Sequence, residues 1–255
     1  MKIQFASDLH LEFHDNWRWL RLNPLEVIGD ILVLAGDIGY LGDDNYAVHP
    51  FWDWAADNFE QVLCCMGNHE FYKYYDIARL TDGFKIEIRP NIHSYYNGVV
   101  SLNDADTDII LSTLWAKIAL ENAYYTENVV SDFRRILYEG ETLTFADFNK
   151  EHERCLSFIR KAVEESSASH KVVVTHHVPS FLLQDPRFKD SRANGAFTVE
   201  LEDYIKSSNI DYWIYGHSHY NKDMAIGNTQ CVSNQLGYVF HNEHLTFASG
   251  KMIEI

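Results

Sequence analysis

Positive charge is scarce in this chain of 255 residues, which has 21 lysines and arginines against 37 aspartates and glutamates and a formal net charge of −16. Proteins that bind long duplex DNA or anionic membranes present a basic face, so this balance argues against both partners. Cysteine is rare too. The four cysteines are too few and too scattered for a disulfide framework, and we interpret the adjacent Cys64 and Cys65 as core thiols. The alternative is a pair of soft metal ligands, which no Cys-x-x-Cys spacing supports.

Long hydrophobic runs are absent as well. No stretch approaches the roughly 18 consecutive apolar residues of a membrane helix, and Asp8 follows the start too closely for a secretory apolar segment. We therefore expect a cytoplasmic protein without a membrane partner. The chain has five prolines and no proline-rich linker, repeat or low-complexity tract, so we expect one domain over residues 1–255, of unknown oligomeric state.

Short apolar runs rich in β-branched residues end in turn residues at intervals, as buried strands do. The expected strands cover residues 2–6, 31–35, 62–66, 109–113, 172–175 and 212–215. Helical stretches at 46–60, 145–165 and 199–208 lie between them. A Gly227-Asn228 turn predicts a hairpin over 224–232, followed by a last strand near 252–255. The alternation of strands and helices is typical of α/β architecture with a mixed sheet.

Residues 115–165 form a longer connection than compact domains usually contain, with helical periodicity and no strand runs. Long connections are usually functional, so we interpret this segment as a helical cap inserted over one end of the sheet. The alternative is a set of plain packing helices.

Five of the expected strands are followed by residues that can bind metals. These are Asp8 and His10, then Asp37, then Asn68 and His69, then His176 and His177, and finally His217 and His219. Loops at the carboxyl ends of strands share one edge of an α/β sheet, so these residues should converge. Carboxylate, amide and imidazole ligands suit Mn, Fe, Zn, Mg or Ni rather than copper(I), without identifying the metal. The set has the composition of a two-metal site.

Five sequence blocks resemble the pattern of the calcineurin-like metallophosphoesterase superfamily. They are DLH at 8–10, GD at 36–37, GNHE at 67–70, THH at 175–177 and GHSH at 216–219. The resemblance implies two mixed β-sheets packed face to face, with helices on both outer faces and a bimetal site at the strand ends. It assigns Asp8, His10 and His219 to the first metal and Asn68, His176 and His217 to the second, with Asp37 bridging both.

The resemblance also gives His69 a catalytic role without making it a ligand. In the family this histidine points at the leaving group, where it stabilises the transition state or protonates the departing oxygen. The alternative is a histidine that merely donates to Glu70 or to a backbone carbonyl. His176 and His177 would face opposite ways in a strand, so only one should point at the metals. The family uses the first, which leaves His177 beside the site or in packing.

Three side chains are candidates for substrate contact, each with packing or solvation as the alternative. Trp115 could stack a planar group, Arg134 could hold a phosphate oxygen, and His177 lies next to a ligand position. The stretch from Asn234 to Tyr238 resembles a turn of bacterial and phage relatives, but Gln235 stands where proline is expected. The role of that turn stays open.

These features favour a metal-dependent hydrolase of phosphate esters. Two cations about 3.5 to 4 Å apart can hold a bridging hydroxide as nucleophile and clamp a phosphoryl oxygen. The expected substrate is a small phosphodiester, a phosphomonoester or a nucleotide. One alternative is a nuclease that uses the same site on DNA or RNA, which the net charge disfavours. The other is a metal-binding interaction scaffold without catalysis, which the complete ligand set disfavours.

Overall fold

Two six-stranded mixed sheets form the centre of the molecule in a computed structural model that describes all 255 residues. The first sheet contains, in spatial order, β15 (Met252–Glu254), β1 (Lys2–Ala6), β2 (Ile31–Ala35), β3 (Gln61–Cys65), β6 (Ile92–Tyr96) and β5 (Phe84–Arg89). The second contains β13 (Met224–Ile226), β14 (Thr229–Ser233), β12 (Tyr212–Tyr215), β11 (His170–Thr175), β8 (Thr107–Ser112) and β7 (Gly98–Leu102). In both sheets the four central strands are parallel and the two edge strands are antiparallel.

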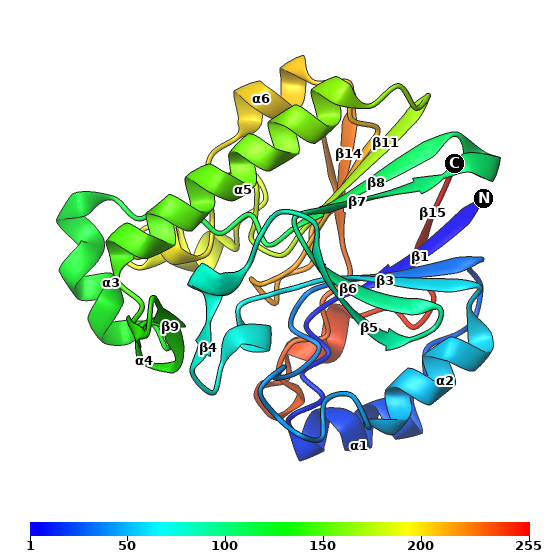
Figure 1. Cartoon of the computed structure of the whole chain (residues 1–255), viewed down its shortest axis with the longest axis horizontal. Coiled ribbons are helices and arrows are strands. Elements are labelled where there is room, and N and C mark those ends of the chain that lie inside the picture. Colours follow the sequence, from blue (N-terminus) through cyan, green and yellow to red (C-terminus); the bar gives the residue numbers. More distant parts are fainter.

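Helices cover the outer face of each sheet (Figure 1). The first sheet is covered by α1 (His14–Leu22) and α2 (Pro50–Asn58), and the second by α5 (Phe145–Glu165) and α6 (Glu202–Ser207). The fold class expected from the sequence is therefore confirmed. None of the helices is both long and apolar enough to cross a membrane.

The core has three layers because successive side chains of a strand point to opposite faces. Ile31 and Val33 of β2 pack between the two sheets, whereas Leu32 and Leu34 pack on the outer face beneath α1 and α2. Strands buried on both faces read as continuous apolar runs, and this is why the sequence predicts them well. Cys64 and Cys65 are free and buried, as predicted, and so are Cys155 and Cys231.

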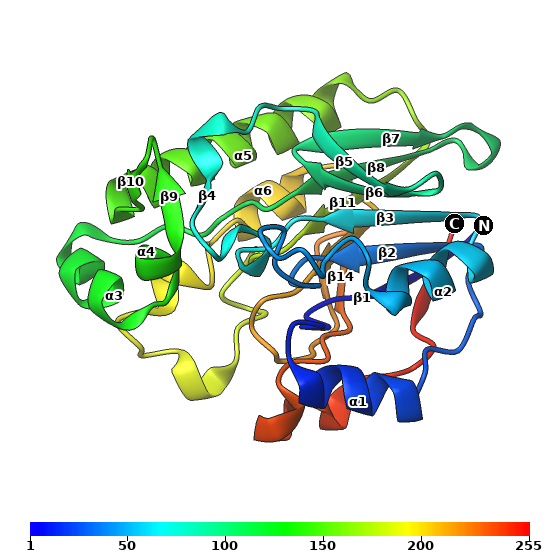
Figure 2. The same cartoon turned by 60° about the horizontal axis from the view of Figure 1, so that its bottom comes forward.

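The segment 115–165 differs from the expected helical cap. It contains two short strands, β9 (Ile136–Tyr138) and β10 (Glu141–Thr142), which pair in a small sheet with β4 (Tyr75–Asp76). Its longest helix, α5, lies along the second sheet instead of over the strand ends (Figures 1 and 2). Among its helices, α3 (Ala123–Val129) and α4 (Asp132–Arg135) lie beyond the strand ends together with β9, on the side away from the two chain termini. The sequence-based expectation of a segment without strands was therefore wrong.

Candidate metal centre

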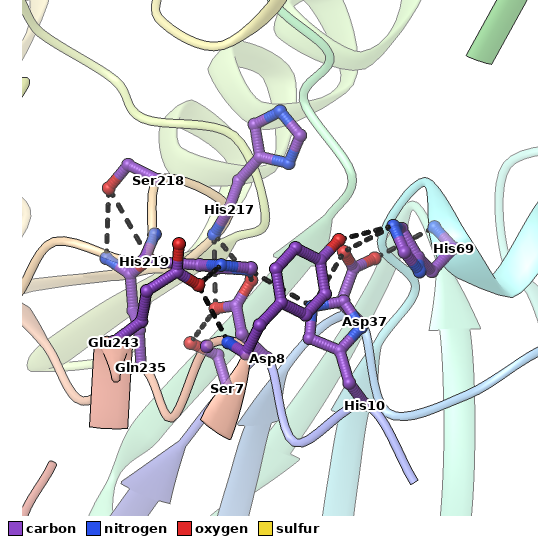
Figure 3. Close-up of polar contacts among 12 residues, drawn as sticks. Ser7, Asp8, His10, Asp37, His69, His217, Ser218, His219, Gln235 and Glu243 are labelled. Carbon is purple, nitrogen blue, oxygen red and sulfur yellow. Dashed lines mark hydrogen bonds and ion pairs between the residues drawn. The ribbon is translucent and has the colours of Figure 1, made fainter. Parts of the chain in front are cut away.

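The metal-binding residue types converge where the parallel strands of both sheets end (Figure 3). Their possible ligand atoms lie within 4.8 Å of one another in three groups: Asp8, His10 and His219; His10, Asp37 and His69; and Asp37, His176 and His217. Asp37 and His10 each belong to two groups, so the three groups form one continuous cluster. The convergence that strand topology predicts is present.

Asp37 lies at the middle of this cluster. Its Oδ2 is 3.8 Å from His10 Nε2, and its Oδ1 is 3.3 Å from His176 Nε2. His10 Nε2 is in turn 3.0 Å from His219 Nε2, and His176 Nε2 is 2.9 Å from Asn68 Oδ1. Acceptor atoms that face one another at such distances need a proton or a cation between them. One carboxylate therefore offers an oxygen to each of two sets of donors.

The two remaining members complete these sets. His217 Nδ1 lies 3.1 Å from His176 Nε2, and Asp8 Oδ1 lies 3.4 Å from His219 Nε2. Asp8 also accepts the backbone N–H of His217 at 3.0 Å, which ties the loop after β1 to the loop after β12. The structure thus brings together all seven predicted ligands, in two sets that share Asp37.

The backbone of the cluster adopts a conformation that few residues tolerate. Five of the seven predicted ligands have a positive φ: Asp8 at 55°, His10 at 47°, Asp37 at 56°, His217 at 73° and His219 at 51°. Left-handed backbone costs about 1 kcal/mol or more at a non-glycine residue and concentrates at functional sites. Packing elsewhere must hold these loops in place.

Two motif glycines allow the loops to approach one another. A Cβ on Gly67 would lie 2.2 Å from Asp37 Oδ1, and a Cβ on Gly36 would lie 2.4 Å from His176 Nδ1. Gly36 also has a φ of 88°, where a side chain is strained. Any larger residue at either position would displace a predicted ligand.

Opposing charges set the protonation of the cluster. Burial alone would raise the pKa of Asp37, but the imidazoles of His176 and His69 hold that pKa well below its usual range. Burial lowers the pKa of His217. Burial also lowers the pKa of His10, and it outweighs the negative charge of Glu12, which acts to raise that pKa. At His176 burial also acts downward, but the Asp37 carboxylate outweighs it and raises the pKa to about 9. Cations that bind here must displace protons from such imidazoles, so binding should release protons.

Glu12 holds two histidines with one oxygen. Its buried Oε1 lies 3.0 Å from His10 Nδ1 and 2.9 Å from His69 Nδ1. A carboxylate beside Nδ1 favours the tautomer with its proton on that nitrogen, which leaves each Nε2 for a ligand or a substrate. Sequence analysis missed Glu12, although its place two residues after His10 was a usable signal.

Two more carboxylates orient predicted ligands from distant parts of the chain. Asp132 Oδ1 accepts the Asn68 amide at 2.8 Å and the Tyr72 hydroxyl at 2.7 Å, which turns Asn68 Oδ1 toward the cluster. Glu243 Oε2 lies 2.6 Å from His219 Nδ1. Sequence analysis missed both because no spacing connects them to the residues that they hold.

Glu70 joins the loops after β2 and β3. Its buried carboxylate accepts the backbone N–H groups of Gly67 at 2.7 Å, Asp37 at 2.9 Å, Ile38 at 2.7 Å and Gly39 at 3.3 Å. Burial and, after it, the negative charge of Asp37 raise the pKa of Glu70 to about 7. The hydrogen bonds from the backbone N–H groups of Ile38 and Gly67 act in the opposite direction and lower the pKa. The Glu70 carboxylate binds these backbone groups and does not face the His69 ring. The alternative in which His69 merely donates to Glu70 is therefore not the arrangement found.

We expect Glu70→Gln to lower the free energy of unfolding by about 2 to 3 kcal/mol, because an amide NH₂ would face buried N–H donors and leave some unpaired. Glu153→Gln is the matched control. Glu153 is exposed and pairs with Lys117, so its loss should cost about 0 to 1 kcal/mol. Urea denaturation of both variants and the wild type measures the difference, and equal small losses would contradict the role given to Glu70.

His69 lies between the cluster and open space. Its backbone N–H donates to Asp37 Oδ1 at 2.8 Å, and its ring stacks on Tyr72 at 4.2 Å between centroids. Burial lowers the pKa of His69, but the carboxylates of Asp37 and Glu12 outweigh burial and raise it. Its Nε2 lies 3.3 Å from the Tyr238 hydroxyl. The ring is thus placed as a proton donor requires, with its Nε2 directed away from Glu12.

The turn from Asn234 to Tyr238 supports the same loops. Gln235 Oε1 accepts the backbone N–H of His219 at 2.6 Å, and Gln235 Nε2 donates to the Tyr220 carbonyl. Tyr238 lies beside His69 and His219. The glutamine that replaces the expected proline therefore holds a predicted ligand in place through its side chain.

The three candidates for substrate contact do not face a substrate, although the His177 ring packs 4.2 Å from the ring of His217. Trp115 is fully buried and donates to the Tyr96 hydroxyl at 3.2 Å. His177 is buried 5.3 Å from the Trp115 ring, and Arg134 points outward to the carbonyl of Asn128 at 2.7 Å. None of the three lines the cavity described next. Their placement argues for packing at Trp115 and His177 and for solvation at Arg134.

A cavity of about 510 Å³ opens above the cluster. Asp37, Asn68, His69, His217 and His219 lie at its base. One wall comes from α3, α4 and the residues between them, and another from the segment 184–198. The part of the inserted segment that borders the cavity is therefore the part around α3 and α4, not α5.

Comparison with known proteins agrees with this geometry. The sequence model described as calcineurin-like phosphoesterase matches residues 1–221. The chain is 27% identical over 262 residues to uncharacterized protein L509 of Acanthamoeba polyphaga mimivirus, covering 92% of this chain and 91% of that protein. Phosphopantetheinyl hydrolase (PptH) from Mycobacterium tuberculosis has a similar structure, with a TM-score of 0.70, 16% identity and coverage of 99% of this chain and 95% of that chain. At such low identity this likeness shows a shared fold.

Proposed function

Because the chain belongs to the calcineurin-like phosphoesterase family, we propose that it hydrolyses small phosphate esters at a site that holds two divalent cations. One observation carries the proposal. The two oxygens of Asp37 face different donor sets, one toward His10 and the other toward His176. A carboxylate placed in this way suits a shared ligand of two ions.

The donor chemistry fits such ions. Asp8, His10 and His219 would hold one cation, Asn68, His176 and His217 the other, and Asp37 both. These oxygen and nitrogen donors suit Mn, Fe, Zn, Mg or Ni, and no cysteine belongs to the cluster. When bound, two cations supply a Lewis acid for a phosphoryl oxygen and an activated water for in-line attack.

The side chains around the cations do the remaining work. Glu12 orients His10 and His69, while Asp132 turns the Asn68 carbonyl oxygen toward the cluster. His69 borders the cavity, so it can give a proton to the oxygen of the departing alcohol. Because the attacking group would be a water activated by the cations, the hydrolysis needs no side-chain nucleophile.

Size and charge favour a small substrate over a polymer. A cavity of about 510 Å³ has the volume of a small-molecule site. A nuclease needs a basic surface that follows the phosphate backbone, but this chain has a net charge of −16 and no lysine or arginine lines the cavity. Phosphodiesters, phosphomonoesters and nucleotides remain the candidates. A phosphopantetheinyl ester belongs among the substrates tested, because a hydrolase of that description shares the fold.

We expect the protein to bind close to two metal equivalents per chain and to lose all hydrolysis on chelation. Elemental analysis after incubation with Mn, Fe, Zn, Mg or Ni measures the first. A panel of p-nitrophenyl phosphomonoesters and diesters, assayed before chelation, after it and after metal is restored, measures the second. Activity that survives exhaustive chelation would remove the metal mechanism. Two bound metals with no turnover on any ester would favour the scaffold alternative.

A further inference from the structure

The cavity lacks positive side chains. No lysine or arginine is among the 22 residues that line it. Apart from the predicted ligands, its charged residues are the carboxylates of Asp132, Asp185 and Glu243, together with His69. Any part of a substrate that extends away from the cations therefore meets walls of neutral or negative character.

Three arginines contact side chains that line the cavity. Arg187 pairs with Asp185 at 2.6 Å. The guanidinium of Arg192 lies 4.8 Å from the centre of the Tyr125 ring. That of Arg135 lies 5.2 Å from the centre of another ring, that of Tyr72. Each of these arginines lies against a lining side chain, and none of them lines the cavity itself.

Asp132 lacks a cationic partner altogether. Its Oδ1 accepts two neutral donors, the Asn68 amide and the Tyr72 hydroxyl. Its Oδ2 is buried without any hydrogen-bond partner. No ion pair offsets the negative charge of the ionised carboxylate, so this charge disfavours a second anion in the cavity.

The outer walls are apolar and partly exposed. Tyr125 and Val129 of α3 line one side, and Phe188 and Phe197 line the segment opposite. These four side chains are between 36% and 56% exposed, although large apolar groups are usually buried. The two walls meet where Thr126 Oγ1 donates to the Arg192 carbonyl. Apolar surface gathered at a cavity marks a place where an apolar group binds.

We propose that this cavity selects phosphate esters whose alcohol part is bulky and uncharged, against esters whose alcohol part carries a second anion. The inference rests on the proposed function, because the cations would bind the reacting phosphoryl group. It narrows the substrate class by excluding nucleoside di- and triphosphates and bisphosphorylated compounds. Repulsion by a carboxylate without an ion-pair partner, here Asp132, is one way to obtain such specificity.

Two diesters with the same leaving group test the proposal. These are p-nitrophenyl pentyl phosphate and p-nitrophenyl 4-carboxybutyl phosphate, which have five-carbon chains that differ in the terminal charge. The chemistry at phosphorus is the same, so the ratio of their kcat/KM values reports charge selection. We expect the metal-loaded protein to favour the pentyl ester roughly 10-fold or more, after correction for alkaline hydrolysis of each ester. A ratio near one, or a preference for the carboxylate, would overturn the proposal.

A positive charge added to the wall should weaken the selection. Val129 is exposed at the end of α3, so Val129→Lys places an ammonium at the cavity without disturbing the core. We expect it to reduce the ratio to about 3 or below. Val48→Lys is the matched control, because Val48 is exposed and does not line the cavity. An unchanged ratio in Val129→Lys, or an equal change in Val48→Lys, would contradict a local charge effect.

A binding measurement separates this inference from the proposed function. Pentyl phosphate and 4-carboxybutyl phosphate can be titrated into the metal-loaded protein by calorimetry. We expect pentyl phosphate to bind about 10-fold more tightly, whether or not the diesters are hydrolysed. Equal affinities would overturn the charge selection. Absence of hydrolysis with a clear affinity difference would count against the hydrolase alone.

Discussion

Asp37→Asn is expected to reduce turnover by about 10³-fold or more and to leave fewer than two metals per chain, because it removes the one charge that both cations would share. Asparagine keeps an oxygen for the His69 backbone N–H that Asp37 accepts at 2.8 Å. It also tolerates the φ of 56° at this position. The fold should therefore survive, so the loss reports on the cations.

Asp8→Asn is the matched comparison. Asp8 has nearly the same backbone, with a φ of 55°, and it is equally buried, but it faces only the set with His10 and His219. We expect Asp8→Asn to weaken one metal and to retain more activity than Asp37→Asn. Elemental analysis, circular dichroism and turnover on the same samples measure both variants. Near-normal turnover with two metals in Asp37→Asn, or equal damage from Asp8→Asn, would remove the bridging assignment.

The sequence predicts the central strands and the cluster well for a physical reason. In β2 and β12 the predicted bounds coincide with the observed ones, since strands buried on both faces are unbroken apolar runs. The bounds of β1 coincide too, although Lys2 and Gln4 interrupt its apolar residues. Ligand types at their ends converge because parallel strands place their carboxyl ends at one edge. Sequence order and topology are enough for this part of the site.

The same reasoning does not predict the elements at the periphery of the fold. Helix α1 is short, buries only Asn16 and Leu20 and has no side-chain cap, so its first residue carries no start signal. Strand β5 is a half-exposed edge strand with a bulge between Glu87 and Arg89. Local patterns are weak in both, and tertiary contacts decide the structure.

The direction in which a side chain points after the end of a strand is the second feature that the sequence does not predict. Trp115 directly follows Leu114, and both have a positive φ, at 50° and 66°. This turn buries the indole against Phe71 and Phe148 instead of presenting it to a substrate. The same limit hides Asp132, which reaches Asn68 across 64 positions of sequence. Contacts of this kind depend on the packed fold and leave no spacing to detect.

His69→Asn is expected to reduce turnover by roughly 10²- to 10⁴-fold while both metals stay bound, because a positioned proton donor contributes about that much. The backbone N–H that binds Asp37 remains in the variant. Only the imidazole between Glu12 and Tyr238 is lost. Esters with poor leaving groups need protonation of the departing oxygen, so they should suffer most, whereas an activated p-nitrophenyl ester should be partly spared.

Two esters that differ mainly in leaving-group pKa, assayed with wild type and His69→Asn, measure this dependence. His14→Asn is the matched control, since His14 is exposed on α1 and outside the cavity. Metal content decides between the two roles that the geometry allows, because the His69 ring also lies within reach of His10 and Asp37. Loss of a metal in His69→Asn would make His69 a ligand. An unchanged rate on the poorer leaving group would leave it only a packing role against Tyr72.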